Sequence, residues 1–192
     1  EKVLADGHAD MVSMARPFLA DSNFVNKARD GREAEINTCI ACNQACLDHA
    51  FKNVRASCLV NPRACHELDL NYIATSSPKR IAVVGAGPAG LAFSTVAAQR
   101  GHEVTLYDAA KEIGGQFNMA KKIPGKEEFF ETLRYFKHKI ELTGVNLQLG
   151  QRKNAQELID DNFDHIVLAT GVHPRMPTID GIGHSKVLNY IE

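Results

Sequence analysis

The chain has 192 residues, with 22 lysines and arginines against 23 aspartates and glutamates, so its net charge at pH 7 is −1. A net charge near zero removes the bulk attraction that draws proteins to nucleic acid or anionic lipid. The sequence contains no long apolar run and no secretory leader, so we expect neither a nucleic-acid nor a membrane partner. The first residue is Glu1 rather than methionine, and we expect a processed or excised piece of a longer chain.

Residues 1–36 make up the first of three segments. Residues 2–5 predict a short helix that ends at Gly7. Residues 10–15 are apolar and bounded by turn residues, which predicts a short buried strand. Arg16 then opens a helix, because the proline that follows it suits a first helical turn.

Residues 37–77 contain all five cysteines and have little periodicity. Clustered cysteines favour a metal site and a reducing, cytoplasmic compartment over disulfides, which would be distributed along the chain. The pattern C-x2-C-x3-C-x11-C provides three close thiolates and a remote one, which is typical of a [4Fe–4S] cluster. Zinc, which more often binds two separated C-x-x-C pairs, and unligated thiols are the alternatives. The four predicted ligands are Cys39, Cys42, Cys46 and Cys58, whereas Cys65 lies outside the pattern.

Residues 78–192 alternate between strand and helix signals, which predicts an α/β domain of the Rossmann-like type with a parallel sheet. The continuous apolar character of the first and last strands is typical of buried parallel strands. A helix with one apolar side is expected to end at Gly144, because glycine readily takes the left-handed conformation of a helix end. The strands are predicted at 80–84, 103–107, 145–149 and 165–169, and the helices at 91–100 and 126–143.

The turn after the first of these strands has the pattern G-x-G-x-x-G. Gly85 permits a tight turn, Gly87 lets the backbone approach a pyrophosphate, and Gly90 allows close packing of helix and strand. Asp108 ends the next strand, where a carboxylate can accept hydrogen bonds from the hydroxyls of an adenosine ribose. The turn therefore predicts a dinucleotide site, and a glycine-rich turn in an empty fold is the alternative. The whole motif is Gly85-Ala86-Gly87-Pro88-Ala89-Gly90.

Two later stretches favour FAD over NAD. The first is Gly114-Gly115-Gln116, and the second is Ala169-Thr170-Gly171 at the end of a strand. Together with the glycine-rich turn they resemble the FAD domain of the two-dinucleotide-binding flavoproteins. In that family these stretches approach the flavin half of the cofactor, which implies FAD contacts for Gly115, Gln116, Thr170 and Gly171.

The order of the three segments resembles that of the bacterial NADPH-dependent 2,4-dienoyl-CoA reductases over essentially the whole chain. Residues 9–21 resemble the last strand and helix of an old-yellow-enzyme-type TIM barrel. Residues 39–48 resemble the cluster loop that follows such barrels, and a flavin domain from Lys79 completes the order. Within it, the runs 114–118 and 123–127 also resemble these reductases. The resemblance implies a fold made of the end of a TIM barrel, an irregular [4Fe–4S] segment and an incomplete FAD-binding domain.

The resemblance also implies cofactors, reaction and partners. In that family a hydride from NADPH reduces FAD, electrons pass singly through the cluster to FMN, and FMN reduces 2,4-dienoyl-CoA in unsaturated fatty acid degradation. Ala15 and Arg16 would help to hold the FMN phosphate, for which a guanidinium is suited, and Gln44 would contact a flavin. We expect an FMN site only partly present and an NADPH site mostly absent, and no catalytic acid can be assigned.

Two further hypotheses stay open. Related old-yellow-enzyme-family NADH:flavin oxidoreductases, enoate reductases and trimethylamine-dehydrogenase-like enzymes vary the cysteine spacing within a similar order. From another class, the chain could be a standalone electron-transfer or metal-binding module without its own substrate.

Overall fold

The computed structural model describes residues 2–191, which divide into two compact units. We call the first the cysteine unit, which consists of Glu1–Ile73 with Glu128–Lys139. The second is the sheet unit, which consists of Ala74–Glu127 with Ile140–Glu192. Each unit is described by itself.

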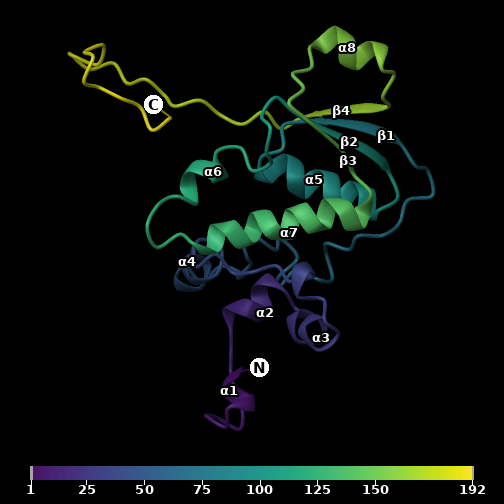
Figure 1. Ribbon diagram of the computed structural model, residues 1–192, viewed down its shortest axis with the longest axis vertical. Helices are drawn as coiled ribbons and strands as arrows, with labels where there is room; N and C mark the ends of the chain where they lie inside the picture. Colours follow the sequence, from purple (N-terminus) through teal and green to yellow (C-terminus); the bar gives the residue numbers. More distant parts are fainter. Residues whose placement is uncertain (1, 192) are drawn as a thin grey trace. The chain divides into compact units, whose positions relative to one another are not determined.

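Four parallel strands in the order β3-β2-β1-β4 form the sheet unit's centre (Figure 1). Ile81 of β1 pairs with Val104 of β2 on one side and with His165 of β4 on the other. The strand order therefore continues from β1 on both sides, to β2 and β3 on one side and to β4 on the other. This creates a switch point at the carboxyl ends of β1 and β4. The predicted α/β architecture with a parallel sheet is confirmed. The strands are β1 Arg80–Val84, β2 Glu103–Asp108, β3 Asn146–Leu149 and β4 His165–Leu168.

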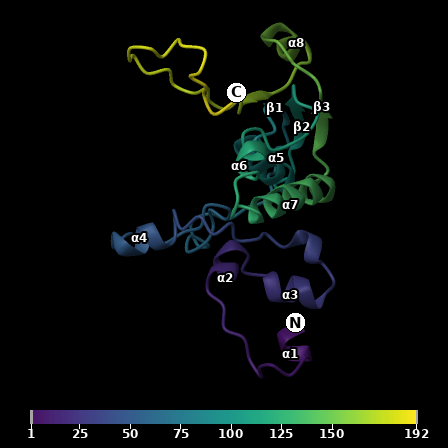
Figure 2. The same ribbon diagram turned by 60° about the vertical axis from the view of Figure 1, so that its left-hand side comes forward.

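Side chains alternate between the two faces of this sheet, as the pleat requires. On one face Ala82 and Tyr107 pack with Leu158, and the ring of Phe163 meets that of Tyr107 edge-on at 6.4 Å. Helix α5 contacts β1 and β2, lies beside them in Figure 2, and buries Leu91 completely. The helices of this unit are α5 Pro88–Gln99, α6 Phe117–Ala120, α8 Ala155–Asp160 and the end of α7 Glu128–Thr143.

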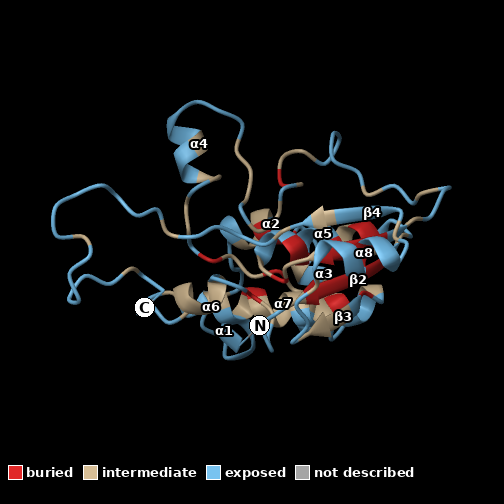
Figure 3. Cartoon of the chain, turned by 90° about the horizontal axis from the view of Figure 1, so that it is seen from above, coloured by how far each residue is buried: buried red, intermediate tan, exposed pale blue. Residues whose placement is uncertain are grey.

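Strand β4 is less buried than its apolar sequence predicts. Ile166 is 41% and Leu168 is 73% exposed, and Figure 3 shows the strand mostly in pale blue. The position of β4 at the end of the strand order gives it one hydrogen-bonded neighbour instead of two. The prediction of a buried strand is therefore correct for strand formation and wrong for burial.

The cysteine unit has short helices joined by irregular backbone. Residues 10–15, predicted as a buried strand, pair with no strand among residues 2–191, and Met11 is 83% exposed. This prediction is wrong for the part of the chain described, because a strand needs a hydrogen-bonded neighbour. Among residues 2–191 no helix has both the length and the apolar character to cross a bilayer. The helices are α1 Lys2–Ala5, α2 Arg16–Ala20, α3 Phe24–Arg29, the 3-10 helix η1 Glu33–Glu35, α4 Leu47–Phe51 and residues 128–139 of α7.

Candidate functional site

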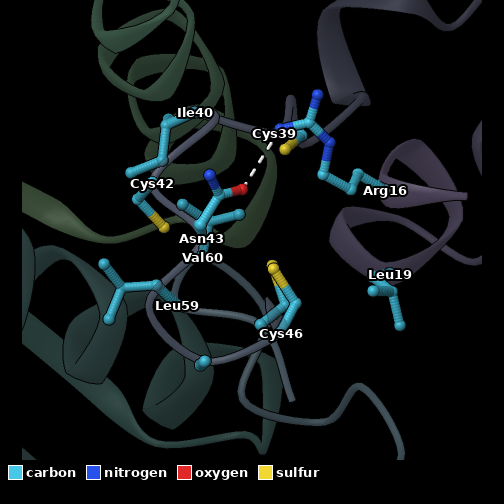
Figure 4. A pocket seen from close by; sticks show the side chains of 11 residues that line it. Arg16, Leu19, Cys39, Ile40, Cys42, Asn43, Cys46, Leu59 and Val60 are labelled. Carbon is cyan, nitrogen blue, oxygen red and sulfur yellow. Dashed lines mark hydrogen bonds between the residues drawn. The ribbon is translucent and has the colours of Figure 1, made fainter. Parts of the chain in front are cut away.

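Four of the five cysteines line one cavity in the cysteine unit (Figure 4). All four are half-buried free thiols, although their positions in the sequence span 39–58. The four that the spacing predicts as one ligand set are therefore brought together, whereas Cys65 is not among the residues of the cavity wall. The four are Cys39, Cys42, Cys46 and Cys58.

The loop between the first cysteines winds through left-handed backbone. Ala41 has a φ of 53° and Asn43 a φ of 59°, a conformation that asparagine tolerates better than most residues. The N–H of Ala41 donates to Sγ of Cys39 at 3.4 Å. Left-handed residues that alternate with right-handed ones turn successive N–H groups to one side, which makes a concavity suited to anions and to iron–sulfur clusters.

The electrostatics of Cys58 show that several sulfurs are close together. Burial raises the pKa of the Cys58 thiol above its ordinary value, and hydrogen bonds with the backbone of Val60 and Asn61 lower it. Negative charge on Cys39 and Cys42 raises this pKa further, an effect that needs nearby groups. A bound metal centre would favour the thiolate form of all these groups, because its positive charge offsets their repulsion.

The donor set fits a centre that contains several irons. Each thiolate of a [4Fe–4S] cluster binds its own iron, so four sulfurs around one cavity with a backbone donor to sulfur suit it. Thiolates that share one zinc ion lie closer together than the thiolates of such a cluster, roughly 4 Å apart given a Zn–S bond of about 2.3 Å. Among residues 2–191, no group of three or more histidine, cysteine or acidic side chains is placed to hold a metal ion directly.

A buried ion pair fixes the two ends of the cysteine loop. The Asp21 carboxylate, 7% exposed, accepts hydrogen bonds from Nζ of Lys27 at 2.6 Å and from the N–H of Asn37 at 3.0 Å. The side chain of Asn37 then donates to the carbonyl of Val60 at 2.7 Å. Asn37 precedes the first ligand and Val60 follows the last, so these bonds close the loop around the cavity. These residues could not be predicted from the sequence, because no motif marks contacts between residues so far apart.

Of the three predicted FMN contacts, one lines the cysteine cavity. Arg16 lines the cysteine cavity, and its Nη1 donates to Oδ1 of Asn43 at 3.3 Å. Ala15 is the exposed residue before α2, and the exposed Gln44 is not among the residues that line the cavity. Arg16 thus faces the cysteines, and its partnership with Asn43 could not be predicted from the sequence.

The glycine-rich turn lies at the carboxyl end of β1 in the sheet unit. Gly85 has a φ of +111°, and a Cβ there would lie 2.2 Å from the carbonyl oxygen of Ala169. A Cβ on Gly90 would lie 1.8 Å from the carbonyl oxygen of Gly85. Contacts within the protein therefore require both glycines.

Gly87 is different, because a Cβ there would meet nothing within 4 Å. Its backbone is extended, with a φ of −75°, and it is the N-cap of α5, with Pro88 and the exposed Ala89 in the first turn. Free N–H groups at the start of a helix attract anions. The open space beside Gly87 is a cradle that a Cβ would fill, and it fits the pyrophosphate of a dinucleotide.

Further predicted residues meet at this edge of the sheet. The Asp108 carboxylate accepts a hydrogen bond from the N–H of Ala86 at 2.6 Å and retains lone pairs for ribose hydroxyls. The N–H of Gly114 donates to the carbonyl of Ala86 at 2.7 Å. A Cβ on Gly115 would lie 3.2 Å from Cα of Gly87, so the Gly114-Gly115-Gln116 stretch packs directly against the glycine-rich turn.

The Gly114-Gly115-Gln116 stretch is hydrogen-bonded to the chain just after Ala169-Thr170-Gly171 through Gln116. The Gln116 side chain donates to the carbonyl of Val172 at 2.6 Å and accepts from the hydroxyl of Tyr190 at 3.1 Å. Thr170 and Gly171 follow β4 as exposed residues, and Gly171 has a φ of +81°. The amide of Gln116 thus binds protein groups, and Tyr190 is a partner that no motif marks.

A parallel sheet with a glycine-rich turn at its switch point defines a dinucleotide-binding protein of the Rossmann-like class. Residues 79–192 match the pyridine nucleotide-disulphide oxidoreductase family. The chain belongs to this family of flavin-dependent oxidoreductases.

Known proteins match the sequence over nearly the whole chain. A metal reductase of Desulforamulus reducens is 40% identical over 93% of the chain, and an NADH oxidase of Thermoanaerobacter brockii is 37% identical over 94%. The chain covers 27% and 28% of these two proteins, about a quarter of their length.

Other relatives have names that refer to different substrates. The structure of a 2-naphthoyl-CoA reductase with 2-naphthoyl-CoA is 37% identical, with a TM-score of 0.94 over 99% of this chain and 29% of its own. A dimethylamine dehydrogenase of Hyphomicrobium is 30% identical over 88% of the chain and 25% of its own length. The relatives thus include both CoA-thioester reductases and amine dehydrogenases.

Proposed function

We propose that the chain is the electron-relay part of an NADPH-dependent flavin and iron–sulfur reductase that acts on 2,4-dienoyl-CoA. The observation that carries the proposal is the convergence of Cys39, Cys42, Cys46 and Cys58 on one cavity, in a chain that also has a dinucleotide cradle. When bound, FAD would take an electron pair from NADPH, and a [4Fe–4S] cluster would deliver single electrons to FMN, which reduces the conjugated double bond.

Each set of residues has a defined task in this proposal. The four thiolates hold the cluster, and the N–H of Ala41 donates to a ligand sulfur. In the sheet unit, Gly87 leaves room for the FAD pyrophosphate, and the Asp108 carboxylate accepts hydrogen bonds from the ribose hydroxyls. Thr170 and Gly171 remain proposed flavin contacts, together with Gly115, while Gln116 orients the backbone after β4.

The substrate class is supported by the 2-naphthoyl-CoA reductase structure, whose ligand is a conjugated CoA thioester. A dienoyl thioester is the aliphatic equivalent, since it also has double bonds conjugated to the thioester carbonyl. The dimethylamine dehydrogenase relative supports the second candidate, an enzyme that removes electrons from an amine.

Metal analysis tests the cluster. In the complete gene product, purified without oxygen, we expect about four irons per chain together with inorganic sulfide. Cys58→Ser should lose most of the iron, whereas Cys65→Ser, a change of the same chemistry outside the cavity, should keep it. One zinc per chain without iron would contradict the proposal.

Turnover of the complete protein tests the substrate. We expect 2,4-dienoyl-CoA to oxidise NADPH, and dimethylamine to leave the flavins oxidised. Reduction of the flavins by the amine would favour the second candidate. NADPH oxidation with artificial acceptors alone would favour an electron-transfer module.

A further inference from the structure

The wall of the cavity lined by the four cysteine thiols also includes a positively charged side chain. Arg16 lines this cavity, and among the lining residues of the described chain it alone has a positively charged side chain. Figure 4 shows its guanidinium turned toward Cys39 and Asn43. Apart from Asn43 and the four cysteines, the other wall residues are apolar, such as Leu19 and Ile40.

The position of this guanidinium is held by the cysteine loop itself. Nη1 of Arg16 donates to Oδ1 of Asn43 at 3.3 Å, across 27 positions of sequence. Asn43 lies between Cys42 and Cys46 and has a left-handed backbone, with a φ of 59°. The loop conformation that gathers the thiols therefore also presents the acceptor that draws Arg16 to them.

A fixed charge in this position has a direct physical consequence. A cluster held by four thiolates is an anion, and each electron that it accepts adds negative charge. A nearby guanidinium stabilises the reduced form more than the oxidised form, because the attraction grows with the charge of the cluster. Net charge and solvent exposure are among the factors that set cluster potentials.

We infer that Arg16 raises the reduction potential of the cysteine-bound cluster, with Asn43 as the residue that positions it. The inference rests on the proposed function, since it needs a cluster in the cavity. It assigns Arg16 a role toward the cluster beyond the phosphate contact that the sequence resemblance implies. Because Arg16 is exposed, dissolved salt should weaken its effect.

The experiment compares cluster potentials in the complete gene product, measured by redox titration with electron paramagnetic resonance, alongside iron and FMN content. Arg16→Gln removes the charge and should shift the potential to lower values with iron retained. Arg16→Lys keeps the charge and should stay near the wild type. Asn43→Gly permits the left-handed backbone but removes the acceptor, so it should give a smaller shift in the same direction.

Salt separates electrostatics from a structural effect. The screening length falls from about 10 Å at 0.1 M salt to about 3 Å at 1 M, so the difference between Arg16→Gln and the wild type should shrink. An unchanged potential in Arg16→Gln with full iron would overturn the inference, even if FMN is lost, since Arg16 would then serve only the phosphate. If Arg16→Gln loses iron, an unchanged potential in Asn43→Gly with full iron would overturn it. A wild-type protein without iron would instead refute the proposed function.

Discussion

Alanine substitutions at two glycines of one turn should have opposite effects on stability. A Cβ on Gly90 would lie 1.8 Å from the carbonyl oxygen of Gly85 and 3.4 Å from Cβ of Ala169. The first contact is with backbone, which cannot rotate away as a side chain can. Overpacking typically costs about 1–3 kcal/mol, and so close a contact places Gly90→Ala at about 3 kcal/mol or more.

Gly87→Ala should instead leave the protein without FAD as stable as the wild type or more stable. The φ of Gly87 is −75°, which alanine adopts freely, and its Cβ would meet nothing within 4 Å. Substitution of such a glycine stabilises proteins by about 0.4–1 kcal/mol, because the unfolded chain loses freedom. FAD affinity should nevertheless fall about 5- to 150-fold, if the new methyl group costs about 1–3 kcal/mol against the pyrophosphate.

Urea unfolding of the flavin-free complete protein measures the stabilities, and titration with FAD measures the affinity. The wild type and Gly183→Ala serve as references, because Gly183 lies far from the motif in sequence and a Cβ there would also meet nothing within 4 Å. Unchanged FAD affinity in Gly87→Ala would refute the cradle, whatever its stability. Wild-type stability in Gly90→Ala would refute the packing argument for the turn.

Two further predictions concern the cysteine unit. Burial raises the pKa of Tyr135 to about 12, and the negative charge of Asp21 acts in the same direction. The raised pKa contributes stability to the folded state that is fully present below about pH 10 and is lost as the pH rises through about 12. Tyr135→Phe should abolish this alkaline loss of about 3 kcal/mol in urea unfolding, and an equal loss in the variant would contradict us. Asp21→Ala leaves the partly buried Lys27 without its carboxylate and should cost about 3 kcal/mol of unfolding free energy, the low end for a buried pair, because Lys27 keeps its bond to the Glu35 carbonyl. Asp21→Ala with Lys27→Met should recover part of it, and a double variant no more stable than the single one would count against a buried ion pair.

The sheet unit could be predicted from the sequence, because its signals are local. Apolar runs gave strands at 80–84 and 103–107, and the structure extends the second strand to Asp108. The long helix ends at Thr143 as expected, followed by Gly144 with a φ of +72°. Exposure of β4 could not be predicted, because it depends on which strand stands at the end of the order.

The cysteine unit could be predicted less well. Residues 10–15 have the composition of a strand, but strand formation depends on a neighbour elsewhere in space. The partnership of Arg16 with Asn43 spans 27 positions and follows no motif. The bonds of Asp21 with Lys27 and Asn37 were likewise invisible, since each partner alone reads as an ordinary polar residue.

The sequence alone determined the parallel α/β architecture, the glycine-rich turn and the set of four cysteines that forms one group. These features depend on residue type and short spacing, which fix local backbone conformation and the available donor atoms. Only the tertiary structure decided that Gly87 opens on free space while Gly85 and Gly90 are packed, and that Arg16 faces the thiols. The physical reason is that packing, burial and charge interactions depend on distances between residues far apart in the chain, which spacing along the sequence does not specify.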